Sequence, residues 1–485
     1  MEWSKLLNQK RVGELFGKEP SETDSRTPFE RDYGRAVFST PVRRLQDKTQ
    51  VFPLETHDAV RTRLTHSLEV SSVSRTLGRE AANWIAEEKK DISPPQVHDI
   101  ETIAATCGLI HDLGNPPFGH AGETAIQTWF GHRLKEEETA RAHGQSDESD
   151  PIFSGMETNE NKVLREQYEN DFLRWEGNAQ TLRLVSRLQV LADFYGINLT
   201  CATFSAACKY VAASNDTDST KEIHEKSKPG FFASEQETFA RVAEEVGTGG
   251  ARNPITYLVE ASDDIVYATG DLEDGVKKGA LDWEFLKTQL KSHAGEDPAL
   301  KWAVQEAEKK IRYTSGSKPV PNGELAQAFR TFSIQKMKEG AFAAFTLRYD
   351  RIMSGDYHKE LVEDPDCAAT KFVAACKKVG QVHVYPSSGT LKLELMGRKV
   401  IHDLMDIFWE GARLCEGKSP SKECRGGFAG KAFDLISGNY REVFKKALAD
   451  GKLPERYCRL QLVTDQIAGM TDSFATSLHK RLMNG

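Results

Sequence analysis

Apolar residues recur at helical spacing along most of the chain. In 62–90, one stripe of an amphipathic helix is formed by Leu64, Leu68, Val73, Leu77, Ala81 and Trp84. In 93–114, Ser93 is a suitable N-cap, Pro94 fits the first turn, and Gly114 ends the pattern. Further helices are predicted over 179–194, 233–247, 253–278, 323–345, 393–412 and 465–482.

Strand-like alternation is scarce. The best hairpin candidate is 377–395 (KKVGQVHVYPSSGTLKLEL). We therefore expect an all-α fold with a small β-hairpin embellishment.

Polar, helix-poor stretches interrupt this pattern at 131–162, 213–232, 315–323 and 416–430. We expect surface insertions or loops within one body, because no segment between them has an independent pattern. The chain also has no internal repeat at a fixed period. The prediction is a single large domain spanning 1–485.

The composition is that of a soluble globular protein, with 39% hydrophobic and 28% charged residues among 485. The formal net charge of −8 argues against attraction of the whole molecule to nucleic acid or an anionic membrane. No stretch approaches the length of a membrane span, and the N-terminus lacks the apolar region of a signal peptide. We therefore expect a cytoplasmic protein with no membrane partner.

The eight cysteines form no C-x-x-C pair. In such a protein, reduced thiols in packing or surface positions are expected.

Histidines and carboxylates gather in three helical segments, at His66, at His111–Asp112 with the nearby His120 and Glu123, and at Asp263–Asp264. A single histidine on a helix usually makes structural hydrogen bonds. The adjacent His–Asp pair differs, because the loop LGNPPFG after it gives both side chains an opening onto one ion. A carboxylate buried there is costly unless a cation or a donor meets it.

Two imidazoles and two carboxylates form a mixed nitrogen and oxygen set. Such a set suits Mn²⁺, Fe²⁺, Mg²⁺ or Zn²⁺ and is unlike the thiolate sets of structural zinc. Spacing alone leaves open whether these residues bind a metal or make structural hydrogen bonds.

Four blocks in this order resemble the bacterial deoxyguanosine triphosphate triphosphohydrolases (dGTPases), which are HD-domain metal-dependent phosphohydrolases. The blocks are RRLQDKTQVFPLETHDAVRTRLTHSLEV, GLIHDLGNPPFGHAGETA, YLVEASDDIVYATGDLEDGV and DQIAGMTDSFA. The resemblance is firm over 30–125 and 253–276 and looser over 175–210 and 380–475.

The resemblance implies an HD-domain helical core over roughly 30–280, with polar insertions at 131–170 and 213–232. The remainder, 281–485, is then a C-terminal helical region for the substrate pocket and assembly.

By this resemblance the metal ligands are His66, His111, Asp112 and Asp263. Asp263 is chosen over Asp264 because the family ligand precedes one residue and then an aliphatic one, here Ile265. The expected cofactor is Mn²⁺ or Mg²⁺, with Fe²⁺, Co²⁺ or Zn²⁺ as alternatives.

The family reaction releases the deoxynucleoside and intact triphosphate, so water attacks the α-phosphorus and the 5′-oxygen leaves. The resemblance assigns catalysis to His120 and Glu123, with His120 as the proton-transfer residue and Glu123 orienting it. From the residues alone, Glu123 equally fits a first-turn glutamate that stabilises a helix N-terminus.

The resemblance also implies the sugar contacts. Gln50 would bond the 3′-hydroxyl, Val51 would lie against the sugar, and Tyr267 would close off the 2′ position. Asp271 follows one turn after Tyr267 on the same helix face, where the family has substrate contacts.

For the rest of the nucleotide, the resemblance implies phosphate contacts from Asn178, Lys209 and Arg63. Tyr385 and Glu394 would lie near the base, where a carboxylate accepts from the N1–H and 2-amino edge of guanine. The Lys209–Tyr210 pair departs from the family because no proline follows it.

The leading hypothesis is a metal-dependent hydrolase of dGTP. One alternative is a broad-specificity dNTP triphosphohydrolase, with or without activation by a second nucleotide. Another is a nucleic-acid-binding or regulatory protein with a vestigial HD site, against which the acidic charge and the complete set of site residues weigh. The resemblance further implies a homo-oligomer, a tetramer or hexamer, and single-stranded DNA as a partner.

Overall fold

The structure is mostly helical, which confirms the all-α prediction. The computed structural model describes the chain except residues 21–23, 53, 55–57, 143–151, 154–155, 157–161, 190–192, 219, 221, 316–319, 387, 417–423, 425 and 485. The first helices are α1 (Trp3–Leu6), α2 (Pro28–Phe38), α3 (Thr40–Arg44), α4 (Arg63–Trp84), α5 (Pro94–Ile110), α6 (Gly119–Ala142), α7 (Lys162–Leu173), α8 (Gly177–Arg183), α9 (Cys201–Ala206) and α10 (Gln236–Val246).

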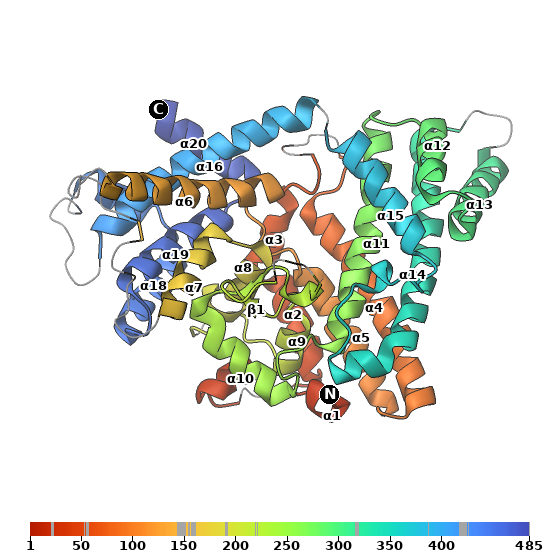
Figure 1. Cartoon of the computed structure of the whole chain (residues 1–485), viewed down its shortest axis with the longest axis horizontal. Coiled ribbons are helices and arrows are strands. Elements are labelled where there is room, and N and C mark those ends of the chain that lie inside the picture. Colours follow the sequence, from red (N-terminus) through yellow and green to blue (C-terminus); the bar gives the residue numbers. More distant parts are fainter. Residues whose placement is uncertain are drawn as a thin grey trace.

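The second half of the chain continues in the same way (Figure 1). Its helices are α11 (Pro254–Lys277), α12 (Trp283–Ala294), α13 (Pro298–Ser315), α14 (Asn322–Ser354), α15 (Thr370–Val379), α16 (Ser388–Leu414), α17 (Phe428–Asp434), α18 (Gly438–Asp450), α19 (Glu455–Ala468) and α20 (Asp472–Asn484). None of the described helices is long and apolar enough to cross a bilayer.

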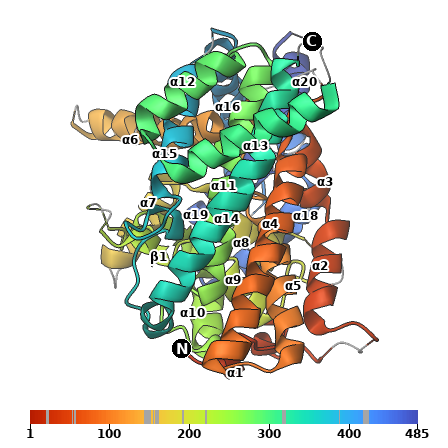
Figure 2. The ribbon, with the colours of Figure 1, turned by 90° about the vertical axis from the view of Figure 1, so that its right-hand side faces the viewer.

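The core has two apolar parts, which the views in Figures 1 and 2 place on opposite sides of the molecule. One part joins α4, α5, α11 and α14 through residues such as Ile103, Leu258 and Phe345. The other joins α6, α16 and α19 through residues such as Phe130 and Leu404. Helices of both parts carry predicted site residues.

Local sequence explains why α4 and α5 pack so closely. Thr62 and Thr65 form a capping box at the start of α4, and Pro94 occupies the first turn of α5. Where the helices meet, a Cβ on Gly108 would lie 2.9 Å from the Cα of Ser71, so only glycine allows this approach. The close contact brings the C-terminal end of α5 beside the first turns of α4.

The described strands are very short. β1 (Ala212–Ala213) and β2 (Pro229–Phe231) pair in parallel, with Ala212 opposite Pro229 and Ala213 opposite Phe231. They lie in the polar stretch predicted at 213–232, and they hold its two ends together.

The predicted hairpin at 377–395 is wrong. There α15 runs to Val379, a π-helical turn covers Gly380–Val384, and α16 begins at Ser388; residue 387 lies outside the described residues. The apparent alternation does not correspond to burial, because Leu391 and Leu395 are exposed. Buried positions in α16 instead recur at Val400, Ile401 and Leu404, which is helical spacing.

The polar stretch at 131–162 is also different from the prediction, because α6 continues through it to Ala142. Most of 143–161 lies outside the described residues. In the other two stretches, 316–319 and most of 417–425 also lie outside them.

The expectation of reduced thiols is wrong for one pair, since Cys415 and Cys424 form a disulfide with their Cα atoms 5.2 Å apart. The chain turns back between α16 and α17, so two cysteines without a spacing motif meet. The other six cysteines are free and buried.

Candidate metal centre and substrate cavity

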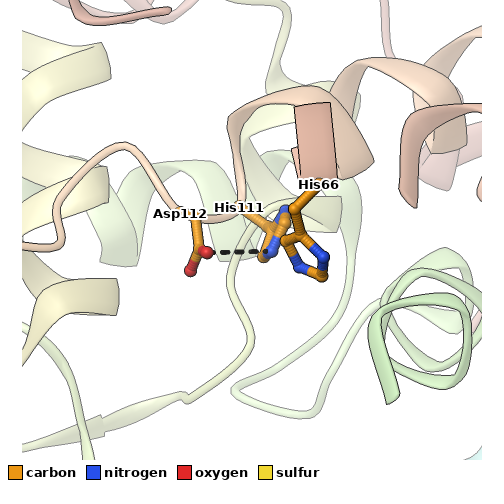
Figure 3. A group of neighbouring side chains, drawn as sticks. All are labelled: His66, His111 and Asp112. Carbon is orange, nitrogen blue, oxygen red and sulfur yellow. Dashed lines mark ion pairs between the residues drawn. The ribbon is translucent and has the colours of Figure 1, made fainter. Parts of the chain in front are cut away.

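Three helices bring the four predicted metal ligands together. His66 projects from α4, His111 and Asp112 follow the last residue of α5, and Asp263 projects from α11. The Nε2 atom of His66 lies 3.0 Å from Oδ1 of Asp263. His111 Nε2 lies 3.4 Å from the same oxygen. It also lies 3.5 Å from Oδ2 of Asp112 (Figure 3). The nitrogen and oxygen donors thus converge on one small volume.

The hydrogen bonding of His111 tests whether these residues fit a metal ion. Its Nδ1 donates to the carbonyl oxygen of Gly108 at 2.8 Å, so the lone pair of the neutral imidazole is on Nε2. That buried Nε2 makes no well-aligned hydrogen bond with any described residue. It faces two carboxylates instead, and a lone pair facing carboxylate oxygens is favourable only with a cation between them. The donor set therefore fits a divalent metal.

The pKa values of the site have the same cause. Burial lowers the pKa of His111, but the carboxylates of Asp112 and Asp263 outweigh it and raise that pKa to about 9. Burial raises the pKa of Asp112, but Arg63 and His111 outweigh it and lower that pKa to about 2. The carboxylates are ionised and the imidazole attracts a positive charge, as either a proton or a metal ion.

Two further side chains hold Asp112 in place. Arg63, the first residue of α4, donates from Nη1 to Oδ2 of Asp112. Asn115 donates from Nδ2 to Oδ1 at 2.5 Å. Arg63, predicted as a phosphate contact, is thus first a partner of this carboxylate while it also lines the cavity.

A cavity of about 450 Å³ opens over this centre, a size typical of small-molecule sites. It is lined by every predicted site residue except Asp271, namely Gln50, Val51, Arg63, His66, His111, Asp112, His120, Glu123, Asn178, Lys209, Asp263, Tyr267, Tyr385 and Glu394.

His120 and Glu123 lie at the start of α6. His120 is 85% exposed, while Glu123 is largely buried, and His120 Nδ1 lies 3.8 Å from Oε2 of Glu123. The two residues before His120, Phe118 and Gly119, have φ angles of 64° and 59°. This left-handed turn reverses the chain so that α6 starts at the cavity.

Tyr385 and Tyr267 meet on another wall of the cavity. The Tyr385 hydroxyl lies 2.5 Å from that of Tyr267 and donates to Oδ2 of Asp271 at 2.6 Å. Asp271 was predicted as a substrate contact, but it lies behind Tyr385 and does not line the cavity. Burial raises the pKa of Asp271 to about 8.

Comparison with known proteins agrees with this geometry. Residues 63–193 match the HD domain, and residues 435–481 match the phosphohydrolase-associated domain. A deoxyguanosinetriphosphate triphosphohydrolase-like protein of Listeria innocua is 36% identical over 491 residues, covering 99% of each chain. The deoxyguanosinetriphosphate triphosphohydrolase of Klebsiella pneumoniae is 32% identical over 490 residues, covering 96% of this chain and 95% of the relative. That of Salmonella enteritidis is 32% identical over 485 residues, covering 94% and 93%.

This chain belongs to the dGTPase family of HD-domain phosphohydrolases. The HD domain implies a divalent metal, and its matched range contains His66, His111 and Asp112.

The dGTPase-family cavity contains residues that sequence reasoning missed. Lys228 lies in the 213–232 stretch, which the resemblance did not cover, and its Nζ lies 3.0 Å from Oε1 of Glu176. Glu176 also accepts from the backbone N–H of Asn178 at 2.5 Å. Both Lys228 and Glu176 line the cavity. The β1–β2 pairing and the packing of β2 against α8 bring Lys228 there, and strands of two and three residues leave no recognisable sequence pattern.

A second group of possible metal ligands lies beside Lys209. His224 Nε2 is 3.0 Å from carboxylate oxygens of both Glu260 and Glu360. However, Glu260 already accepts from the buried Arg252 at 2.6 Å, and Lys209 Nζ lies 3.6 Å from it. These cations balance the carboxylates, so this group fits an ion-pair network that orients Lys209 better than it fits a metal.

Proposed function

We propose that this dGTPase-family chain hydrolyses dGTP to deoxyguanosine and inorganic triphosphate, by attack of water on the α-phosphorus. The observation that carries this proposal is the single cavity that joins the mixed His/Asp centre, the exposed His120 and the tyrosine pair. The Klebsiella and Salmonella relatives, both named deoxyguanosinetriphosphate triphosphohydrolase, support the same substrate.

His66, His111, Asp112 and Asp263 would hold the divalent ion, for which Mn²⁺ or Mg²⁺ is proposed first. When bound, such an ion supplies Lewis-acid polarisation of a phosphoryl oxygen and lowers the pKa of water. Arg63 and Asn115 keep Asp112 ionised and oriented for this task.

His120 would move the proton that the leaving group needs. A 5′-alkoxide is a poor leaving group, so an acid near the 5′-oxygen lowers the barrier. The exposed imidazole of His120 lines the cavity. The largely buried carboxylate of Glu123 also lines it, 3.8 Å from Nδ1 of His120. Glu123 then orients the ring.

The lysines that line the cavity would bind the triphosphate. Lys209 and Lys228 line the cavity together with Asn178, although the whole chain carries a net charge of −8. Two ammonium groups and an amide are suited to phosphate oxygens. Local charge therefore decides what the cavity binds, while the acidic surface does not attract polyanions.

The tyrosine pair and Gln50 would select the sugar and Glu394 the base. Gln50 Oε1 is buried without a hydrogen-bond partner among the described residues, so it is available to a 3′-hydroxyl. Tyr267, held by Tyr385, would leave no room for a 2′-hydroxyl. The carboxylate of Glu394 would accept from N1–H and the 2-amino group of guanine.

A chromatographic assay of the purified chain with each dNTP and with GTP, in Mn²⁺ or Mg²⁺, tests this proposal. It predicts deoxyguanosine and triphosphate from dGTP and no turnover of GTP. Comparable turnover of all four dNTPs would favour the broad-specificity alternative. If no nucleotide is hydrolysed with either metal, the chain is a binding or regulatory protein.

A further inference from the structure

One buried carboxylate of the C-terminal region contacts two separate walls of the cavity. Asp472, the first residue of α20, is 2% exposed. Its Oδ1 accepts from the backbone N–H of Phe118 at 2.9 Å. Its Oδ2 accepts from the backbone N–H of Thr49 at 3.0 Å and from the Thr49 hydroxyl. Asp472 therefore ties the loop before His120 to the segment that continues into Gln50.

The loop held in this way needs external support. Phe118 has a φ of 64°, a backbone conformation that residues other than glycine rarely adopt. Such a conformation persists only where surrounding contacts hold it. The bond from Phe118 N–H to Asp472 is one such contact. Packing against α16 is another, since a Cβ on Gly397 would lie 2.7 Å from the Phe118 ring.

The other end of the same loop is held by Lys48. This buried ammonium donates to the carbonyl oxygen of Asn115 and, at 2.8 Å, to that of Ala468 at the end of α19. Asn115 in turn donates to the carboxylate of Asp112. Both ends of the loop between Asp112 and His120 are thus attached to the C-terminal region.

Asp472 is not needed to cap its own helix. Thr471, the residue before it, accepts the N–H of Phe474 on its hydroxyl at 3.3 Å, which is the bond of an N-cap. Both carboxylate oxygens of Asp472 are directed instead to Thr49 and Phe118. Neither Asp472 nor Lys48 lines the cavity.

We propose that Asp472 is a positioning residue of the active site. It holds the left-handed turn at Phe118 and Gly119 so that His120 faces the cavity. It also holds Thr49 in place so that the next residue, Gln50, faces the cavity. This inference rests on the proposed function, because it takes His120 and Gln50 as the groups that act on the nucleotide. It also gives the phosphohydrolase-associated segment, 435–481, a task in the reaction.

Asp472→Asn tests this role. An asparagine side chain has one acceptor oxygen. Whichever way its amide is oriented, the NH₂ group faces the backbone N–H of either Phe118 or Thr49, and that hydrogen bond is lost. We expect kcat for dGTP to fall about tenfold to a hundredfold, by more than KM rises, because His120 is misplaced. Bound metal should be unchanged, because Asp112 and its partners are retained.

Asp32→Asn is the matched control. Asp32 is buried and makes the same pair of bonds to a threonine, accepting from Thr200 N–H at 2.9 Å and from its hydroxyl at 2.7 Å, but it does not line the cavity. We expect this variant to lose stability while its kcat stays at the wild-type value. An equal loss of kcat in both variants would overturn the proposal, as would wild-type kcat in Asp472→Asn.

Hydrogen exchange of a peptide spanning 113–119 tests the placement without any turnover. Compared at equal distance from the melting temperature, the loop should exchange about tenfold faster in Asp472→Asn than in Asp32→Asn. If the wild type hydrolyses no dNTP, the proposed function fails, while faster exchange still supports the positioning of this loop. Unchanged exchange would overturn it. If Asp472→Asn does not fold, Thr49→Val removes only the hydroxyl bond, and wild-type exchange and kcat in that variant would overturn the proposal.

Discussion

The hydroxyl group of Tyr385 lies 2.5 Å from that of Tyr267, although the two residues are 118 positions apart. Tyr385 precedes α16, while Tyr267 lies in the middle of α11, four residues after Asp263. The contact therefore joins the wall of the cavity to the helix that carries the proposed metal ligand Asp263, and the Tyr385 hydroxyl also donates to the buried carboxyl group of Asp271.

Tyr385→Phe is expected to weaken selection of the sugar. Without the hydroxyl, Tyr267 loses its partner and Asp271 is left buried with one bond fewer, at a cost of about 1–3 kcal/mol in stability. KM for dGTP should rise, and the preference for dGTP over GTP should fall about tenfold. Steady-state kinetics with both nucleotides measure this.

Tyr349→Phe provides the control for that variant. The Tyr349 hydroxyl donates to Oδ2 of Asp91 at 2.7 Å, also in a partly buried site, but away from the cavity. Its loss should lower the melting temperature and leave the dGTP preference unchanged. A preference that changes equally in both variants would contradict the role given to Tyr385.

Helical periodicity was sufficient to predict most of the fold. The apolar stripes over 62–90 and 253–278 correspond to α4 and α11. The His111–Asp112 pair directly follows α5, in agreement with the helix end predicted before Gly114. The hairpin prediction failed because a short run such as VHV near Val384 has the same pattern in a strand and in a π-helical turn.

Only those site residues that lie in local sequence motifs could be predicted from the sequence. His66, His111 and Asp112 lie in such motifs. Lys228 does not, because a three-residue strand brings it to the site from a distant part of the chain. Asp472 lies in the block DQIAGMTDSFA, but that block does not reveal that its carboxylate contacts Thr49 and Phe118. Likewise, the position of Asp271 behind Tyr385 depends on a contact 114 residues apart, which helix-face spacing cannot reveal.

Lys228→Gln is expected to weaken triphosphate binding. Lys228 lines the cavity and, among the described residues, forms an ion pair with Glu176 at 3.0 Å. Its ammonium group faces the cavity and can also bind phosphate oxygens. KM for dGTP should rise about tenfold at low salt with little change in kcat, because the lost contact is made before the reaction as well as during it.

Lys226→Gln is the control in the same segment. Lys226 pairs with the exposed Asp216 at 3.6 Å and does not line the cavity, so KM should stay at the wild-type value. Equal KM values for the Lys228 variant and the wild type would remove Lys228 from the phosphate site.

A metal-binding assay should distinguish variants of the proposed metal ligands from variants of the proposed proton-transfer residue. His111→Ala and Asp112→Ala each remove a donor and should lose bound Mn²⁺ together with activity. His120→Ala should keep bound metal and lose about a hundredfold or more in kcat. Elemental analysis of the dialysed variants measures this.

His98→Ala controls for the loss of a histidine. His98 is half exposed and pairs with Glu101 outside the cavity, so it should retain both metal and turnover. Full activity in His120→Ala would exclude the assigned role of that residue.

The stability of the fold should depend on pH through Asp171. This carboxyl group accepts from Ala233 N–H at 2.7 Å and from the hydroxyl groups of Ser214 and Tyr457. Burial raises its pKa from 3.8 to about 7. Because the folded pKa is raised, the contribution of Asp171 to stability is fully present below pH 3.8 and is lost as the pH rises towards 7.

Asp171→Asn removes this titration. The free energy of unfolding of the wild type minus that of the variant should therefore fall between about pH 4 and about pH 8, by at most about 4 kcal/mol. Urea denaturation at both pH values measures it. A difference that is the same at both would show that Asp171 keeps an ordinary pKa.

The most direct test of the central claim is the hydrolysis of dGTP by the wild-type chain in ¹⁸O-labelled water with Mn²⁺. Attack on the α-phosphorus predicts unlabelled deoxyguanosine and triphosphate that carries the label, detected by mass spectrometry. Label in the 5′-hydroxyl of deoxyguanosine, or the formation of dGMP and pyrophosphate, would contradict the account.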